Sequence, residues 1–415
     1  MKKRHILLIT ILFIIGIVIT GCKSKYAAAP GNREEKWTKD IDYLSKQLPK
    51  KHKNLFFSLT KEKFNKEIEE LKEAVPKMND DEVKIGIYKI VASVKDGHTS
   101  AYLHYNKLYP ISLYWFKEGI YVTSTIPEYK HIMNCKLVKI NGKNIEKVAE
   151  EVAKVISHEN DAQPKSMIPR FVTMPDILHG LKIINNREKA TFTFQNSENK
   201  IINVDIKEME FDEESKKLFI NNYNDKNIPL YMKNRNKNYW FEYLKDKNTL
   251  YFKYNACMEM KEKPFKQFSK ELLEVLDKNN VDKLIVDMRD NGGGNSSILT
   301  PFIEEVKKLN INDKDKLFVI VGRRTFSSAV LNSIDFRNET KATFVGEPTG
   351  GKPNHYGEVK NFQLPNTKMK VSYSTKYFTT SKEDTPSFMP DKIIEPSILD
   401  FIDKEDSVLQ SIIGK

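Results

Sequence analysis

One loop of this 415-residue chain places hydroxyl side chains where a nucleophile could act. The loop "RRTFSSAV" follows an apolar run and opens a helical pattern, so a serine in it would stand at the positive end of a helix dipole. That position suits a nucleophile whose product is an oxyanion, although serines at such junctions also cap helices. Thr325, Ser327 and Ser328 are therefore candidates either for a catalytic group or for a helix cap.

A second loop, "MRDNGGGNS", follows a different apolar run. Consecutive glycines at 292–294 let the backbone turn its N–H groups toward a ligand at close range, as an oxyanion hole requires. The alternative is a flexible turn between a strand and a helix. No lysine follows within the loop, so the pattern gives little support for phosphate binding.

The stretch "GEPTGGKPN" begins like a phosphate-binding loop, but Pro353 stands where that loop needs a serine or threonine. Lys352 is therefore a candidate for a reaction other than phosphate binding. In "SVKDGHTSAYL", His98 lies in a turn rich in small polar residues. A single histidine is weak evidence for a catalytic base, so His98 is a candidate only together with the serine and glycine loops.

The elements that must position these loops follow from hydrophobic periodicity. Phe64, Ile68, Leu71 and Val75 recur at helical spacing, and "NDDEVKIGIYKIVASV" predicts a second helix with an acidic start. We therefore expect a helical region over 37–109, after a polar tether over 23–36.

Residues 110–210 change to a β pattern. "SLYWFKEGIYVTST" and "EKATFTFQNSENKIINVDIKEM" each predict a hairpin, and "CKLVKINGKNIEKV" predicts a strand, a tight turn and a helix. A charged, asparagine-rich connection covers 211–237. This β-rich block is a candidate for a separate module.

After residue 238 apolar strands alternate with helices. "TLYFKYN", "DKLIVDMR" and "KLFVIVG" predict buried strands, and the segments between them predict helices. Such an α/β pattern indicates a mainly parallel sheet, whose ligand sites lie in the loops beyond the carboxyl ends of the strands. The three loops described above are in those positions.

Four motifs in order, "DGHTSAYL", "KLIVDMRDNGGGN", "GRRTFSSA" and "ATFVGEPTGGKPN", resemble the tail-specific, or carboxy-terminal processing, serine peptidases and the related tricorn core proteases. The resemblance covers about 249–400 well and the helical start more loosely. It implies a multidomain α/β (α+β) fold with a helical start, a PDZ-like module over 110–210 and a βαβ catalytic core of the ClpP/crotonase type over 238–415. It also implies a polypeptide substrate and no cofactor.

Carried over by position, the resemblance assigns the nucleophile to Ser327. The family typically has Ser-Ala-Ser-Glu there, whereas this chain has Ser-Ser-Ala-Val, so Ser328 stays an alternative nucleophile and the common Glu is replaced by Val330. Gly292, Gly293 and Gly294 match the oxyanion-binding glycines. Lys352 matches the base of the Ser-Lys branch, and His98 matches the base of the tricorn-like branch.

The pKa values of lysine and histidine side chains help to choose between the two candidate bases. A free lysine has a pKa of about 10.4, so acting as a base near pH 7 requires that pKa to fall by roughly three units. Imidazole already titrates near neutrality, which favours His98 over Lys352. The tricorn-like branch also uses an acid to orient the imidazole, and Glu358 and Glu383 are both candidates.

The PDZ-like module has two interpretations. "CKLVKINGKNIEKV" resembles the late strand and helix of a PDZ domain, which captures peptide ends by adding a strand to its sheet. The block lacks a clear glycine loop for a carboxylate, so a degenerate structural domain is an equal alternative.

The first 22 residues indicate export. A basic start, an apolar run from Ile6 to Ile19 and the ending "ITGC" predict a signal peptide and a lipobox, with lipid on Cys22; a simple membrane anchor is the alternative. The protein would then be extracytoplasmic, held at the outer face of a bacterial cell membrane. Loss of the signal, with Lys2, Lys3 and Arg4, lowers the net charge from +12 to +9, and this moderately basic balance suits an anionic membrane surface or cell-wall polymer, whereas nucleic acid is not an expected partner of an exported chain.

Cysteine usage gives no reason to expect a metal. Cys135 and Cys257 lie far apart, and the absence of a CxxC motif or Cys/His cluster leaves zinc unsupported. We expect two buried free thiols, with a disulfide between them as the alternative that an exported location allows.

Two other functions compete with a peptidase. A binding lipoprotein without catalytic activity on the same fold would explain the departure at Val330. "SLTK", Ser58 to Lys61, fits the S-x-x-K element of penicillin-binding enzymes, but the S-D-N and K-T-G elements do not occur, and Ser58 is predicted to cap the helix that contains Phe64.

Overall fold

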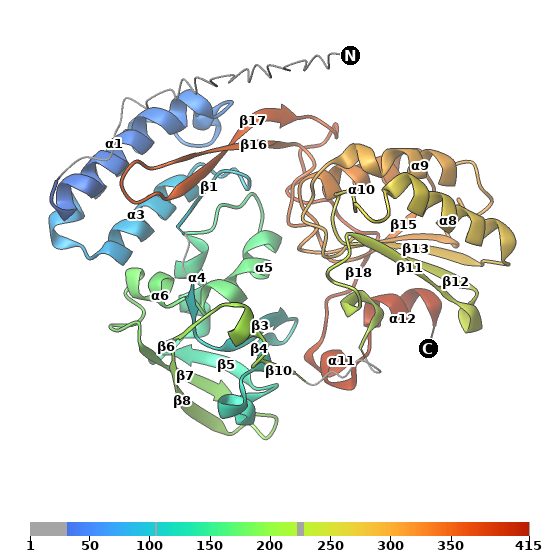
Figure 1. The fold of residues 1–415 in the computed structure, drawn as a ribbon, viewed down its shortest axis with the longest axis horizontal. Helices are drawn as coiled ribbons and strands as arrows, with labels where there is room; N and C mark the ends of the chain where they lie inside the picture. Colours follow the sequence, from blue (N-terminus) through green and yellow to red (C-terminus); the bar gives the residue numbers. More distant parts are fainter. Residues whose placement is uncertain (1–30, 104–105, 222–227, 415) are drawn as a thin grey trace, which may run out of the picture.

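The computed structural model describes residues 31–103, 106–221 and 228–414 (Figure 1). The predicted signal peptide, the lipobox with Cys22 and most of the predicted tether lie outside these residues. Within the described ranges, no helix combines the length and the apolar character needed to cross a membrane.

The N-terminal region contains both helices predicted within 37–109, and the end of that range also holds two short strands, Ser100–Tyr102 and Lys107–Leu108. Its helices are α1 (Arg33–Lys51), α2 (Lys61–Ala74) and α3 (Asp80–Ala92). Helix α1 begins inside the segment predicted as a tether, because the Asn32 side chain accepts a hydrogen bond from the Glu35 amide and caps it. The cap of α2 is Thr60 rather than Ser58, whose hydroxyl donates instead to the Val94 carbonyl.

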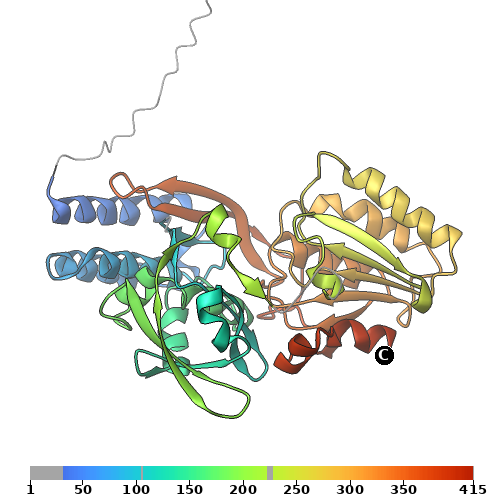
Figure 2. The same ribbon diagram turned by 60° about the horizontal axis from the view of Figure 1, so that its bottom comes forward.

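A long hairpin from the C-terminal part of the chain packs on these helices (Figure 2). Strands β16 (His355–Gln363) and β17 (Lys370–Phe378) form a sheet with β1 (Ser100–Tyr102), in the order β1-β17-β16. The prediction assigned the hairpin to the catalytic core, but its apolar side chains share a hydrophobic cluster with the helices because burying them requires that partner. The shared residues include Leu364, Met369, Val371 and Tyr373.

The turn of this hairpin is tied to helix α1 by a buried aspartate. Asp40 is fully buried, and its carboxylate accepts hydrogen bonds from the backbone amides and the side chains of Asn366 and Thr367. Helix α1 thus fixes the far end of a hairpin whose near end follows the "GGKPN" loop.

The β-rich module contains both predicted hairpins, β3–β4 and β7–β8. Its main sheet has the order β10-β4-β5-β7-β8, and β3 pairs with β4. Strand β10 comes from the predicted connection. The strands are β2 (Lys107–Leu108), β3 (Ile111–Phe116), β4 (Gly119–Thr125), β5 (Lys136–Ile140), β6 (Lys143–Asn144), β7 (Lys189–Gln195), β8 (Ile201–Lys207), β9 (Met209–Glu210) and β10 (Ile220–Asn221).

Short helices complete the β-rich module. The predicted strand, Asn141–Gly142 turn and helix are present, with α4 following β6. The periodicity did not reveal α5 or α6, each of which has a proline in or at the start of the helix. The helices are α4 (Ile145–Ala153), α5 (Ala162–Phe171), α6 (Pro175–Gly180) and α7 (Glu213–Lys216).

The C-terminal part has the predicted βαβ pattern. Its sheet runs β11-β12-β13-β14-β15-β18, with β11 antiparallel to β12 and the other neighbours parallel. Strand β12 is buried at every position. The strands are β11 (Tyr239–Leu244), β12 (Thr249–Tyr254), β13 (Lys283–Asp287), β14 (Leu317–Val321), β15 (Thr343–Gly346) and β18 (Lys392–Ile393).

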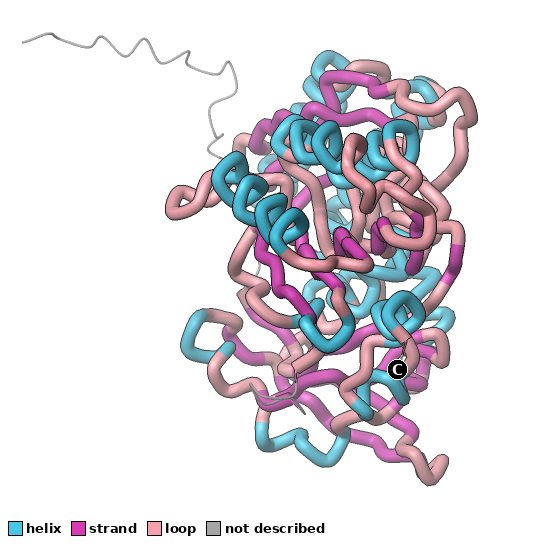
Figure 3. The backbone as a smooth tube through the Cα atoms, turned by 90° about the vertical axis from the view of Figure 1, so that its right-hand side faces the viewer, coloured by secondary structure: helices cyan, strands magenta, loops and turns pink. Residues whose placement is uncertain are grey.

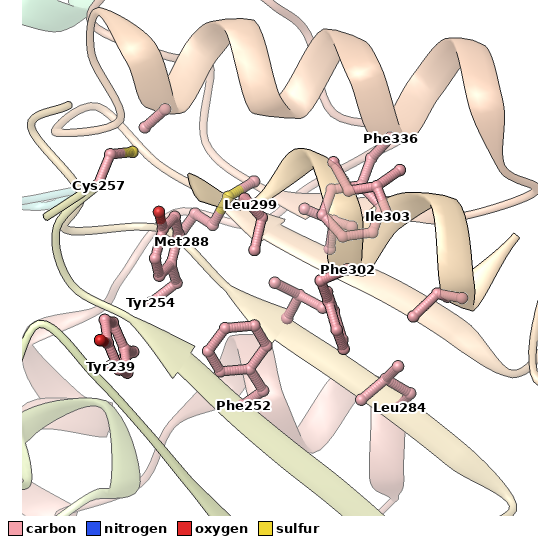
Figure 4. Close-up of a cluster of buried hydrophobic side chains, with 14 of the residues drawn as sticks. Tyr239, Phe252, Tyr254, Cys257, Leu284, Met288, Leu299, Phe302, Ile303 and Phe336 are labelled. Atoms are coloured by element: carbon pink, nitrogen blue, oxygen red, sulfur yellow. The ribbon is translucent and has the colours of Figure 1, made fainter. Parts of the chain in front are cut away.

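Helices cover both faces of this sheet. Figure 3 shows the molecule from the side on which the sheet and its helices lie. Helices α8, α9 and α10 lie over one face, where Phe252, Leu299 and Phe302 belong to a large apolar cluster (Figure 4). Helix α12 covers the other face through Val408, Leu409 and Ile412. The helices are α8 (Phe265–Lys278), α9 (Thr300–Val306), α10 (Ser328–Glu339), α11 (Ile398–Asp403) and α12 (Ser407–Ile413).

The prediction of free thiols is confirmed for both cysteines in the described part of the chain. Cys135 and Cys257 are buried and unpaired. Burial raises the pKa of the Cys257 thiol to about 11, so this thiol is un-ionised and unreactive near pH 7.

Candidate active site

The three glycine- and serine-containing loops meet at the carboxyl edge of the parallel sheet. They follow β13, β14 and β15, which are neighbours in the sheet, so their ends lie side by side. A Cβ atom built on Gly293 of the first loop would lie 2.7 Å from the Ser327 Cβ of the second loop. One built on Gly351 of the third loop would lie 3.2 Å from the Ser327 nitrogen.

Ser327 has a strained backbone at the start of helix α10. Its φ of 52° and ψ of −127° lie in a region that residues with a side chain rarely adopt, and such strain clusters at functional sites. Its side chain makes no capping hydrogen bond among the described residues. This conformation resembles a nucleophile elbow, in which a strained turn presents the hydroxyl at the sheet edge.

The other two hydroxyls of the loop have structural partners. Thr325 Oγ1 donates to the Met288 carbonyl and accepts from the Gly322 amide. Ser328 Oγ donates to the Gly294 carbonyl at 2.7 Å, which joins the serine loop to the glycine loop. Within the described part of the chain, the Ser327 hydroxyl is the one of the three without such a role, and none of the three caps α10.

The glycine loop packs directly against Ser327. Gly293 and Gly294 have φ values of 105° and 136°, which side chains rarely allow. The Gly293 amide donates to Asn291 Oδ1 at 2.9 Å, so it must exchange this partner before it can bind an oxyanion. The oxyanion-binding role of Gly292, Gly293 and Gly294 stays a prediction.

Replacing Gly293 with alanine is expected to lower kcat against a peptide by roughly 10²-fold or more, because the new Cβ would push Ser327 out of position. That Cβ would lie 2.7 Å from the Ser327 Cβ and 3.0 Å from the Ser328 nitrogen. Gly292→Ala is the matched control, since its Cβ would meet no atom within 4 Å. Equal kcat values for the two variants would contradict this account.

His98 lies beside the serine loop in a buried environment. Its ring centroid is 4.4 Å from that of Phe326, which precedes Ser327, and 5.2 Å from that of His355. Neither ring nitrogen has a hydrogen-bond partner among the described residues, so the ring is not bonded to Ser327 in this structure. Burial, aided by His355 and opposed by Asp96, lowers the pKa of His98 to about 4, so the ring is neutral near pH 7.

Lys352 follows Gly351, which packs beside Ser327. The Lys352 side chain, however, forms an ion pair. Its Nζ atom lies 2.8 Å from the exposed carboxylate of Asp384. Its backbone carbonyl lies 2.8 Å from His355 Nδ1. A lysine base must be neutral before it takes a proton, so Lys352 would first have to leave Asp384.

The two glutamates considered as the orienting acid lie on the surface. Glu358 is exposed in strand β16, and Glu383 is exposed in the loop after β17. No hydrogen bond or ion pair connects either side chain to His98 in the described structure.

Sequence reasoning missed a buried acid next to His98. Asp96 Oδ2 accepts hydrogen bonds from His52 Nε2 at 2.9 Å, Thr99 Oγ1 at 2.5 Å and Ser374 Oγ at 2.6 Å. Asp96 Oδ1 accepts the backbone N–H of His98 at 2.9 Å and lies 3.9 Å from the ring Nδ1. The Asp-x-His spacing could have predicted that Asp96 lies next to His98, because an aspartate side chain often accepts a hydrogen bond from the backbone amide two residues later.

The β-rich module contacts the site from two directions. The Asn160 side chain donates to the carbonyls of Gly350 and Pro386, beside the lysine loop. Arg323, the first residue of the serine loop, donates to the Trp115 carbonyl of β3 and forms a buried ion pair with Glu347. The module therefore helps to hold the loops that carry Ser327 and Lys352.

Comparisons with known proteins support the fold. No protein-family model matches the chain, and no curated protein matches its sequence. A serine-to-alanine mutant of CPAF is 13% identical, covers 92% of this chain and 98% of its own, and has a TM-score of 0.66. Mature CPAF with lactacystin is 12% identical, covers 89% and 96%, and has a TM-score of 0.63.

These neighbours have the fold of the tail-specific serine peptidases. The chain is accordingly a multidomain α/β protein of that fold, and the resemblance predicted from four motifs is confirmed at the level of the fold.

Proposed function

We propose that this protein is a serine endopeptidase that hydrolyses peptide bonds of exported polypeptides. The observation that carries the proposal is the strained, uncapped Ser327 at the start of α10, with a glycine loop against its side chain. A structural serine at this junction would be expected to cap the helix and to have ordinary backbone angles.

The proposed reaction begins when Ser327 Oγ attacks the carbonyl carbon of the scissile bond. His98, which is neutral near pH 7, takes the hydroxyl proton and then gives it to the leaving amine. Water then attacks the carbonyl carbon of the acyl-enzyme, His98 takes a proton from that water, and the bond to Ser327 Oγ breaks as His98 returns the proton to the serine oxygen. Lys352 stays the alternative base, with charge stabilisation or substrate binding as its other role.

The negative oxygen of the tetrahedral intermediate needs donors beside Ser327. The amide of Ser328 is in the first turn of α10, where backbone N–H groups have no partner within the helix. The amides of Gly292, Gly293 and Gly294 are the other proposed donors. The positive end of the helix dipole adds to this stabilisation.

The location is proposed from the sequence. The N-terminal signal and the lipobox support a lipoprotein that is anchored through Cys22 on the outer face of a bacterial cell membrane. Its substrates would then be polypeptides outside the cytoplasm. Loss of Lys2, Lys3 and Arg4 with the signal would leave a net charge of +9, which suits an anionic surface nearby.

A fluorophosphonate probe and casein test the proposal on the purified protein. We expect casein cleavage and a single covalent label, which peptide mapping by mass spectrometry assigns to Ser327. A label on Ser328 would show that Ser328, and not Ser327, is the nucleophile. Peptide binding with neither turnover nor label would favour the alternative, a catalytically inactive binding lipoprotein.

A further inference from the structure

The carboxylate of Asp96 is buried at the centre of a polar network that the proposed reaction does not use. The side chain is fully buried, yet it accepts hydrogen bonds from three other side chains and one backbone amide. Burial acts to raise the pKa of Asp96, and the bonds from His52, Ser374 and Thr99 outweigh it and hold that pKa below its usual value. The group is therefore an ionised carboxylate inside the protein.

The donors to Asp96 are themselves fixed. His52 Nδ1 accepts the Asn54 amide at 3.0 Å, so the proton of the neutral ring is on Nε2 and points to Asp96. Ser374 belongs to β17, whose hairpin is fixed to helix α1 through Asp40. Ser374 lies 278 residues after Asp96 in the chain, so a distant segment helps to hold this carboxylate in place.

This carboxylate faces the ring of His98. Asp96 Oδ1 lies 3.9 Å from His98 Nδ1, which has no hydrogen-bond partner among the described residues. A movement of roughly 1 Å would turn that approach into a hydrogen bond. Asp96 and His355 are the titratable groups that act on His98, with Asp96 favouring the charged ring and His355 opposing it.

We propose that Asp96 is the positioning residue for His98. Its carboxylate accepts the Nδ1 proton, which leaves Nε2 free to take the proton from Ser327 Oγ. The carboxylate also stabilises the imidazolium that then forms. This inference rests on the proposed peptidase function, and it assigns to Asp96 the role for which Glu358 and Glu383 were considered.

The tautomer of His98 gives a test that needs no catalysis. In protein labelled with ¹⁵N-histidine, the ring nitrogens of a neutral histidine report which one carries the proton, and the His98→Gln variant assigns the His98 signals. We expect the proton on Nδ1 at pH 7. A proton on Nε2 would overturn the inference, because that nitrogen could not then accept from Ser327.

Asp96→Asn tests the same inference by activity. We expect kcat to fall roughly 10²- to 10⁴-fold while KM changes less than about threefold, because the amide removes the charge but not the substrate site. The His98 proton signal should also move from Nδ1. Unchanged kcat and an unchanged tautomer would overturn the inference.

Asp40→Asn is the matched control. Asp40 is also fully buried and also accepts hydrogen bonds from a turn, but it lies at the far end of the hairpin. We expect Asp40→Asn to lower the Tm without a comparable loss of kcat. If the wild-type protein neither cleaves casein nor reacts with the probe, the proposed function fails. The tautomer of His98 then still shows whether Asp96 accepts the Nδ1 proton of that ring.

Discussion

Ser327→Ala is expected to lower kcat against casein or a peptide roughly 10⁴- to 10⁶-fold and to abolish fluorophosphonate labelling. The reason is that covalent catalysis is lost entirely when the attacking oxygen is removed. The rest of the site should be preserved, because the Ser327 side chain makes no capping bond in the described structure. The measurement is single-turnover and steady-state hydrolysis, with the Tm recorded for each protein.

Ser328→Ala is the control for that experiment. Its hydroxyl donates to the Gly294 carbonyl at 2.7 Å, so its loss should loosen the glycine loop and lower kcat more modestly while labelling persists. Persistent labelling of Ser327→Ala, together with loss of the label in Ser328→Ala, would make Ser328 the nucleophile.

His98→Gln and Lys352→Met are expected to differ strongly. We expect His98→Gln to lower kcat at least roughly 10³-fold, because it removes the proton acceptor, and Lys352→Met to lower it less than about tenfold. The buried ring of His98 is neutral near pH 7, with its pKa lowered to about 4. Lys352 is in an ion pair with Asp384.

The two variants should be compared under identical conditions with a fluorogenic peptide. The folded state of each is checked by its thermal unfolding. A large loss in Lys352→Met with little loss in His98→Gln would reverse the assignment and make Lys352 the base. Asp384→Asn provides a further comparison, since it removes the partner of Lys352 and leaves the lysine in place.

Local patterns predicted most of the secondary structure. Helices α2 and α3, the β3–β4 and β7–β8 hairpins, and the strands β12, β13 and β14 are present where periodicity placed them. Such periodicity records which face of an element is buried, and that information is local. The order of the parallel strands also made it reasonable to expect the three loops at one edge.

The long hairpin was harder to place. Its sequence alternates as any hairpin does, and nothing within β16 or β17 says that the apolar face packs on helices from the start of the chain. The acid next to His98 was missed for the same reason. Asp96 is significant because His52 and Ser374, from distant segments, converge on it.

Buried charge gives a further example of what the sequence could not show. Lys253 lies in a strand that was predicted as buried, and its side chain is fully enclosed. It can be enclosed because Nζ lies 3.1 Å from Asp287 and 3.0 Å from Asp290. A lysine in an apolar run does not indicate by itself which carboxylates will pair with it.

Residue types and spacings were enough to predict many of the helices and strands, the free thiols, and the loops that could carry a nucleophile, oxyanion-binding glycines and a base. Each depends on residue types and spacings within about twenty residues, the range of one strand and one helix. Folding of the whole chain was needed to show that the amide of Gly293 is bound to Asn291, that Lys352 pairs with Asp384, and that Asp96 faces His98. These are matters of distance between segments far apart in the chain, and distance is fixed only when the hairpin, the helices and the sheet pack together.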